Sequence, residues 1–208
     1  MYLFTRSRTI DPGELSGAMA FVPEITERVR SITGVDVQAW AAVMSPEAGL
    51  VTWSAWFESL KALEVAGDQL TADSGYMKAV EKGDDYFDGG IVDGLAQVVY
   101  GTVDPDANPA YAAVASAAST NGRLADAISG GIEIAEFASR VSGQNTLFVV
   151  GATGPYGGVA WITGNPDIET LEAGESALMA DPEWLQLIDR VSPAYLPGAS
   201  QTIFRRIA

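Results

Sequence analysis

The 208-residue chain contains neither cysteine nor histidine. Without cysteine it can form no disulfides, thiolate nucleophiles or thiolate metal sites. The additional lack of histidine excludes Ser-His-Asp and Cys-His catalysis, His-ligated haem and the common zinc sites. Any chemistry must therefore rely on oxygen-bearing side chains, Lys, Arg and aromatic residues.

The chain is also poor in positive charge. Only 12 Lys and Arg residues stand against 27 Asp and Glu residues, which gives a formal net charge of −15. Such a charge repels phosphate backbones and anionic membrane surfaces, so we expect neither nucleic acid nor a membrane as a partner.

Long apolar runs are missing too. No segment approaches about 18 consecutive apolar residues, and the N-terminus MYLFTRSRTI lacks an apolar stretch with a small-residue cleavage site. This pattern predicts a cytoplasmic protein. Because 48% of the residues are hydrophobic, the chain has enough apolar material for a packed globular core.

An internal repeat divides the chain into two halves. Apolar residues spaced by three or four predict an amphipathic helix over residues 15–32, which ends at Gly34. The same pattern recurs 109 residues later over residues 124–141 and ends at Gly143. We therefore expect two copies of one structural unit.

The remaining elements repeat in the same order. Asp73 and Asp181 are expected to be the N-caps of a further short helix in each half, the latter followed by Pro182. Second helices are predicted at 60–71 and 168–179, and strands at 2–9, 37–44, 50–57, 95–100, 111–119, 147–152, 159–163 and 199–204. Each half is thus βαββαβ with a short extra helix before its last strand. We expect an N-terminal unit at 1–101, a linker at 102–109 and a C-terminal unit at 110–208.

Two features distinguish the halves. Gly130 and Gly131 lie in the middle of the second-half helix, where each costs about 1 kcal/mol relative to Ala. Their retention predicts the close approach of another backbone. The first-half helix contains Pro23, which we expect to break or kink it.

Several stretches resemble the dimeric α/β-barrel superfamily, which includes antibiotic-biosynthesis monooxygenase-like and NIPSNAP-like proteins. They are residues 51–60, the turns at 73–76 and 181–184, and the closing Phe204-Arg205-Arg206-Ile207. The resemblance implies an α+β fold in which two ferredoxin-like βαββαβ units in tandem form an intramolecular dimeric α/β barrel. The chain would be its own pseudo-dimer, as a monomer or within a homodimer. Many haem-binding members use a His ligand, which this chain lacks, and we expect no cofactor.

Two acid-rich segments are candidates for metal sites. Residues 82–90 lack the alternating ligand spacing that calcium sites use. A second segment begins at Asp104 like an EF-hand loop, but Pro109 replaces the required Gly and Ala115 the bidentate Glu. We interpret both segments as solvated loops and expect no metal site.

The two halves differ in the size of their strand residues. A second-half strand, residues 112–118, is mostly Ala, whereas Trp40, Trp53 and Trp56 lie on first-half strands. Large and small residues can simply interdigitate to native packing density. Alternatively, they leave an apolar cavity at the barrel centre, walled by Trp and capped by a few polar groups.

The candidate ligand-binding residues for such a cavity are Arg6, Arg8, Trp40, Trp53, Trp56, Gln97, Tyr100 and Gln201. A partly buried Arg6 or Arg8 would recognise an anion in this interpretation. In the alternative interpretation, these arginines are ordinary strand residues paired with nearby carboxylates. No catalytic residue is assigned.

Two hypotheses about function remain. The first is a small-molecule-binding protein or a cofactor-independent enzyme, of the oxygenase, cyclase or isomerase type, acting on an apolar or aromatic ligand in the barrel cavity. The second is a non-catalytic structural or assembly subunit that acts through its surface.

Overall fold

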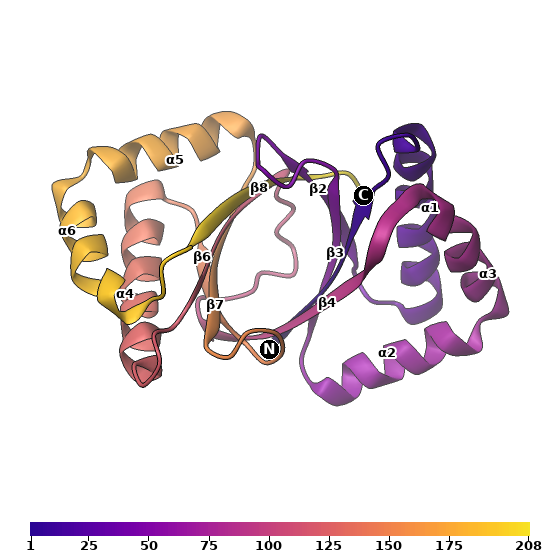
Figure 1. Ribbon diagram of the computed structural model, residues 1–208, viewed down its shortest axis with the longest axis horizontal. Helices are drawn as coiled ribbons and strands as arrows, with labels where there is room; N and C mark the ends of the chain where they lie inside the picture. The colour runs from indigo at the N-terminus through magenta and orange to yellow at the C-terminus, as the bar shows by residue number, and fades with distance from the viewer. The chain divides into compact units, whose positions relative to one another are not determined.

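The first half of the chain follows the predicted element order (Figure 1). The computed structural model describes all 208 residues. The elements are β1 (Tyr2–Ile10), α1 (Leu15–Thr33), β2 (Gln38–Val43), β3 (Leu50–Phe57), α2 (Leu60–Ala72), α3 (Ser74–Gly83), the 3₁₀ turn η1 (Asp84–Tyr86) and β4 (Phe87–Tyr100).

The second half repeats this order element by element. Its elements are β5 (Tyr111–Ala118), α4 (Leu124–Ser142), β6 (Thr146–Gly151), β7 (Gly158–Asn165), α5 (Ile168–Ala180), α6 (Pro182–Val191), the 3₁₀ turn η2 (Ser192–Ala194) and β8 (Ser200–Arg206). No helix is long and apolar enough to cross a membrane. The tandem repeat of the βαββαβ unit is therefore confirmed.

The chain forms two compact units, which we call unit 1 and unit 2. Unit 1 contains Met1–Leu95 together with Arg205–Ala208, and unit 2 contains Ala96–Phe204. The end of the chain pairs with β2 in unit 1, where the Ile207 N–H donates to the Ala39 carbonyl at 2.8 Å. Within unit 1, β3 pairs with both β1 and β2, and within unit 2, β7 pairs with both β5 and β6 while β6 also pairs with the end of β4, all antiparallel. The expected fold class is thereby confirmed.

The helix ends form as the repeat predicts. Gly34 and Gly143 end α1 and α4 in the left-handed conformation, with φ of 68° and 70°. The Asp73 carboxylate accepts from the Tyr76 N–H at 2.6 Å, and the Asp181 carboxylate accepts from the Glu183 N–H at 2.8 Å. Both aspartates are thus the N-caps of α3 and α6.

Strand β4 is longer than predicted. It begins at Phe87 rather than near Leu95, so half of the segment expected to be a solvated loop is strand. Its glycines and aspartates have low strand propensity, so the sequence pattern does not predict a strand there. Contacts with β1 compensate for this propensity, because Thr5 Oγ1 lies 3.5 Å from the Gly94 carbonyl and Arg6 bonds Asp93.

The expected break at Pro23 does not occur. Helix α1 is continuous from Leu15 to Thr33 with Pro23 inside it. Pro23 lies on the exposed face of the helix. The carbonyl left without an N–H donor by Pro23 belongs to Met19, which is itself 39% exposed, so water can bond it.

The mid-helix glycines of unit 2 admit side chains rather than another backbone. A Cβ at Gly131 would collide with the ring of Phe148, which is fully buried, and one at Gly130 would lie 3.1 Å from Val191. The Gly131 carbonyl also accepts from Trp161 Nε1 at 2.8 Å. The predicted close approach is real, but the group that approaches is an aromatic ring.

Replacing Gly131 with Ala should destabilise the protein by about 1–3 kcal/mol, because the buried Phe148 ring has no space to move into. Gly67→Ala is the matched control: Gly67 lies within α2, an added Cβ there would meet open space, and the substitution should stabilise by up to about 1 kcal/mol. Urea unfolding followed by circular dichroism measures both. Equal effects of the two substitutions would contradict this packing.

The burial of Tyr195 predicts a specific pH dependence of the free energy of unfolding. Its hydroxyl donates to the Ala127 carbonyl at 2.6 Å, and burial raises the pKa of Tyr195 to about 12. The folded state therefore favours the protonated phenol, so this contribution to stability is complete below about pH 10 and is lost as the pH rises towards 12. Over that range the wild-type free energy of unfolding should fall more steeply than that of Tyr195→Phe. Parallel curves for the two proteins would refute the assignment.

Candidate functional site

The sheet of unit 1 has two chemically different faces. Val51, Ala55 and Phe57 of β3 are buried in clusters that include residues of the helices, such as Val22 and Ala66. Figure 1 shows α1, α2 and α3 on this side of the unit 1 strands. Because successive strand residues point to opposite faces, the intervening side chains of β3 point away from the helices. We call this second face the open face.

The open face carries rows of small polar side chains. In the strand register, Thr5 of β1 lies opposite Ser54 of β3, which lies opposite Gln38 of β2. The next row contains Ser7, Thr52 and Trp40 in the same order. The side chains of each row lie on one face because directly paired residues in antiparallel strands point the same way.

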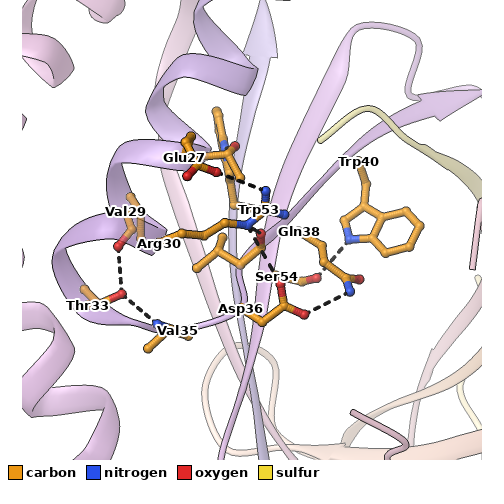
Figure 2. A network of polar contacts seen from close by, with 12 residues as sticks. Glu27, Val29, Arg30, Thr33, Val35, Asp36, Gln38, Trp40, Trp53 and Ser54 are labelled. Carbon is orange, nitrogen blue, oxygen red and sulfur yellow. Dashed lines mark hydrogen bonds and ion pairs between the residues drawn. The ribbon is translucent and has the colours of Figure 1, made fainter. Parts of the chain in front are cut away.

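Hydrogen bonds link these rows. The Ser7 and Thr52 hydroxyl oxygens are 2.8 Å apart. Figure 2 shows the second bond, in which Trp40 Nε1 donates to Ser54 Oγ at 2.9 Å. The Trp40 indole is 7% exposed, so this bond satisfies a buried donor and fixes the ring. Two hydroxyls and one indole N–H are thereby held in defined positions.

The three candidate tryptophans divide between the two faces. Trp56 lies opposite Leu3 on the open face and is half-buried, so Trp40 and Trp56 share that face. Trp53 faces the helices, where its Nε1 donates to Thr26 Oγ1 at 2.9 Å and its ring lies 6.1 Å from that of Phe87. Trp53 therefore anchors helix α1 to the sheet.

Arg6 also lies on the helix side of β1. Its Nε and Nη2 each donate to a carboxylate oxygen of Asp93 at 2.8 Å. These hydrogen bonds raise the pKa of the Arg6 guanidinium, and burial partly opposes them. Arg6 thus forms a bidentate ion pair with Asp93 of β4.

Arg8 is more deeply buried, at 8% exposure. Its Nη2 lies 2.7 Å from Asp84 Oδ1 and 3.4 Å from the Gly89 carbonyl, and the guanidinium lies 4.7 Å from the centre of the Phe87 ring. Arg8 Nε has no hydrogen-bond partner. Both arginines therefore have the carboxylate partners of the alternative interpretation.

The other candidates belong to unit 2. In the β4–β6 register, Gln97 lies opposite Val150 and Tyr100 opposite Phe148. Tyr100 and Val150 pack against the cluster of Phe148 beneath α4, so this side of β4 faces the helices of unit 2. Gln97 is exposed, as is Gln201 on β8. Their role in ligand binding stays a prediction.

The hydroxyl groups of the open face were missed in the sequence. Ser7, Thr52 and Ser54 are short polar residues that stand alone at alternate strand positions, where they are less conspicuous than Trp and charged residues. The alternation in residues 50–57, where Thr52, Ser54 and Trp56 separate buried apolar residues, was the signal that could have found them.

The open face of β1, β2 and β3 contains no ionisable group. Its members are Leu3, Thr5, Ser7, Thr9, Gln38, Trp40, Ala42, Leu50, Thr52, Ser54 and Trp56. Such a face can stack aromatic rings and exchange hydrogen bonds with neutral oxygen atoms. A His-ligated haem does not fit this chain, because the sequence has no His to ligate it.

Comparison with solved structures finds proteins with a similar fold. A putative monooxygenase from Fusobacterium nucleatum has a TM-score of 0.73 at 8% identity and covers 100% of this chain and 92% of its own. A putative monooxygenase from Lactobacillus acidophilus has a TM-score of 0.67 at 10% identity, with 100% and 94% covered. An anthrone oxidase-like protein has a TM-score of 0.68 at 12% identity, with 100% and 91% covered.

The chain shares the fold of these three proteins. No protein-family model matches the sequence, and no curated protein is similar enough to it to count as a relative. At such low identities the likeness shows the fold alone, so the function of a site in this chain depends on its own residues.

The two arginine pairs should differ in their contribution to stability. Asp84→Ala leaves the buried Arg8 guanidinium without its carboxylate and should lower the free energy of unfolding by about 1–3 kcal/mol. Arg8→Met removes the buried charge itself and should cost less. Asp93→Ala breaks the more exposed pair with Arg6 and should cost at most about 1 kcal/mol. Chemical denaturation measures the free energy of unfolding of each variant. The expected ranking is wrong if Arg8→Met is the most damaging of the three.

Proposed function

We propose that this protein binds a neutral aromatic small molecule on the open face of unit 1. The observation that carries the proposal is the sharing of one face by two indoles and a group of positioned hydroxyls, with no ionisable side chain among them. Ligand sites typically combine aromatic lining with a few fixed polar groups. An aromatic ring with hydroxyl or carbonyl substituents matches both components.

The half-buried Trp56 is the stacking surface in this proposal. Trp40 is held by Ser54, whereas the Trp56 indole is not held by a hydrogen bond of this kind. A ligand can therefore cover the Trp56 ring without breaking a bond within the protein. The Ser7 and Thr52 hydroxyls, 2.8 Å apart, can each exchange one further hydrogen bond with a ligand oxygen.

A cofactor-independent oxygenase is the second candidate. The likeness to two putative monooxygenases and an anthrone oxidase-like protein favours it. Ser, Thr and Trp side chains do not ionise near neutral pH, so the open face offers no general base. In such a reaction an acidic substrate would release its proton to solvent water and give its electrons to dioxygen, and the face would orient it.

Trp56→Ala should weaken the binding of 1-naphthol, our probe, by about tenfold, because stacking area is lost without loss of a structural hydrogen bond. Trp184→Ala is the matched control, since that indole packs against Phe137 on the helical side of unit 2. Isothermal titration calorimetry measures both affinities.

Two results would overturn the binding proposal: no heat of binding at millimolar 1-naphthol, or equal weakening by the two substitutions. Oxygen uptake with anthrone as the probe separates the second candidate from simple binding. Uptake that depends on Trp56 supports an oxygenase, and binding without uptake supports a binding protein.

A further inference from the structure

A concave surface lies on the helix side of unit 1, apart from the open face. It is a groove of about 470 Å³ between the end of α1, the end of β3 and the first turns of α2. This volume falls within the range of roughly 300–1,000 Å³ that is usual for small-molecule sites. The proposed function makes no use of it.

The floor of the groove is apolar. Phe57 and Ala66 belong to a buried cluster that partly buried Val35 also packs against, and Val65 lines the groove while remaining 44% exposed. The groove therefore offers apolar side chains that a hydrocarbon chain or a ring can contact.

The lining of the groove also contains polar side chains and a single cation. Lys61 is the only charged residue of the lining, next to Ser59, whose hydroxyl caps α2 by accepting from the Ala62 N–H at 3.1 Å. Lys61 Nζ pairs with Glu64 at 2.6 Å, but both side chains are more than half exposed, so the pair is weak and open to competition. The first turn of α2 contains no acidic residue.

The second copy of the unit serves as an internal comparison for the width of the groove. Thr33 and Ser142 end α1 and α4 in the same way, since each hydroxyl bonds the carbonyl four residues earlier and accepts an N–H from two residues later (Figure 2 for Thr33). Opposite Ser142 lies Gly174, where a Cβ would be 3.1 Å from the Ser142 Cβ. Unit 1 has the larger Thr33 and Ala66 at the two equivalent places, and both line the groove.

The charge at Ser59 and Lys61 of the groove also differs between the copies. Asp167 and Glu169 of α5 are the equivalents of Ser59 and Lys61. Unit 2 therefore places two carboxylates where unit 1 places a hydroxyl and an ammonium group. An anion would be repelled by the carboxylates of unit 2 and attracted by the ammonium group of unit 1.

We propose that the groove of unit 1 binds an amphipathic monocarboxylate, with the carboxylate at Lys61 and the apolar body over Phe57, Val35 and Ala66. Charge complementarity selects the anion, because Lys61 is the one charged group of the lining and the helix start adds positive potential. The apolar floor selects a hydrocarbon body over a small hydrophilic acid such as acetate.

Calorimetric titration with three probes that each carry an unbranched ten-carbon chain, below their micellar concentrations, tests the proposal: decanoate, decan-1-ol and decyltrimethylammonium. Decanoate should bind most tightly. Lys61→Glu, which copies the charge of Glu169, should weaken decanoate by about tenfold or more and leave decan-1-ol unchanged. Lys78→Glu makes the same charge change on an exposed residue of α3 outside the groove, and should have little effect.

A second variant locates the site. Ala62 is an exposed lining residue, so Ala62→Trp fills the groove without entering the core and should abolish decanoate binding while circular dichroism stays unchanged. Trp56→Ala should leave decanoate affinity intact, which separates this groove from the open face. The proposal is overturned if wild-type protein does not bind decanoate, if Ala62→Trp still binds it, or if Lys61→Glu and Lys78→Glu weaken it equally.

Discussion

The alternation of side chains along β3 is the constraint on which unit 1 depends. Val51, Trp53, Ala55 and Phe57 must all face the helices, because each belongs to, or packs against, a buried cluster there. The bond from Trp53 to Thr26 pins this register, since a fully buried threonine on α1 accepts from the indole N–H. A slip of one residue would bury Thr52 and Ser54 against apolar helices and expose Phe57. The packing of one face thus determines which residues the other face can present.

Burial of the arginines follows from the same constraint. Arg6 and Arg8 share the helix side of β1, where a cation without a partner would be costly. Both find their partners at or just before β4: Asp93 for Arg6, and Asp84 with the ring of Phe87 for Arg8. These long-range pairs help to hold a glycine-rich strand that has little propensity of its own. The cations that the sequence offers for recognising an anion on the open face are used for the architecture instead.

The repeat, the order of the elements, the helix caps and most strand bounds could be predicted from the sequence, because local patterns encode them. Hydrophobic spacing, Gly34 with Gly143, and Asp73 with Asp181 each act within a few residues. The start of β4 could not be predicted, because pairing with β1 stabilises it across more than 80 residues of chain. The candidate site was predicted only in part: Trp40 and Trp56 lie on one face, but choosing the face required the helix contacts of Trp53. The hydroxyls became visible only once the faces were assigned.

The two copies differ at residues that set the distance between helices or the local charge. They are alike at the residues that terminate helices. At the end of the first helix, Thr33 and Ser142 make the same two backbone bonds, so the local structure there is preserved. The facing residue is Ala66 in one copy and Gly174 in the other, and this single carbon changes how closely two helices can pack. In unit 2, Gly131 admits the Phe148 ring by the same principle. At these two positions unit 2 has glycine where unit 1 has Val22 and Ala66, and Ala66 lines the groove of unit 1. Divergence of this kind leaves the shared fold intact.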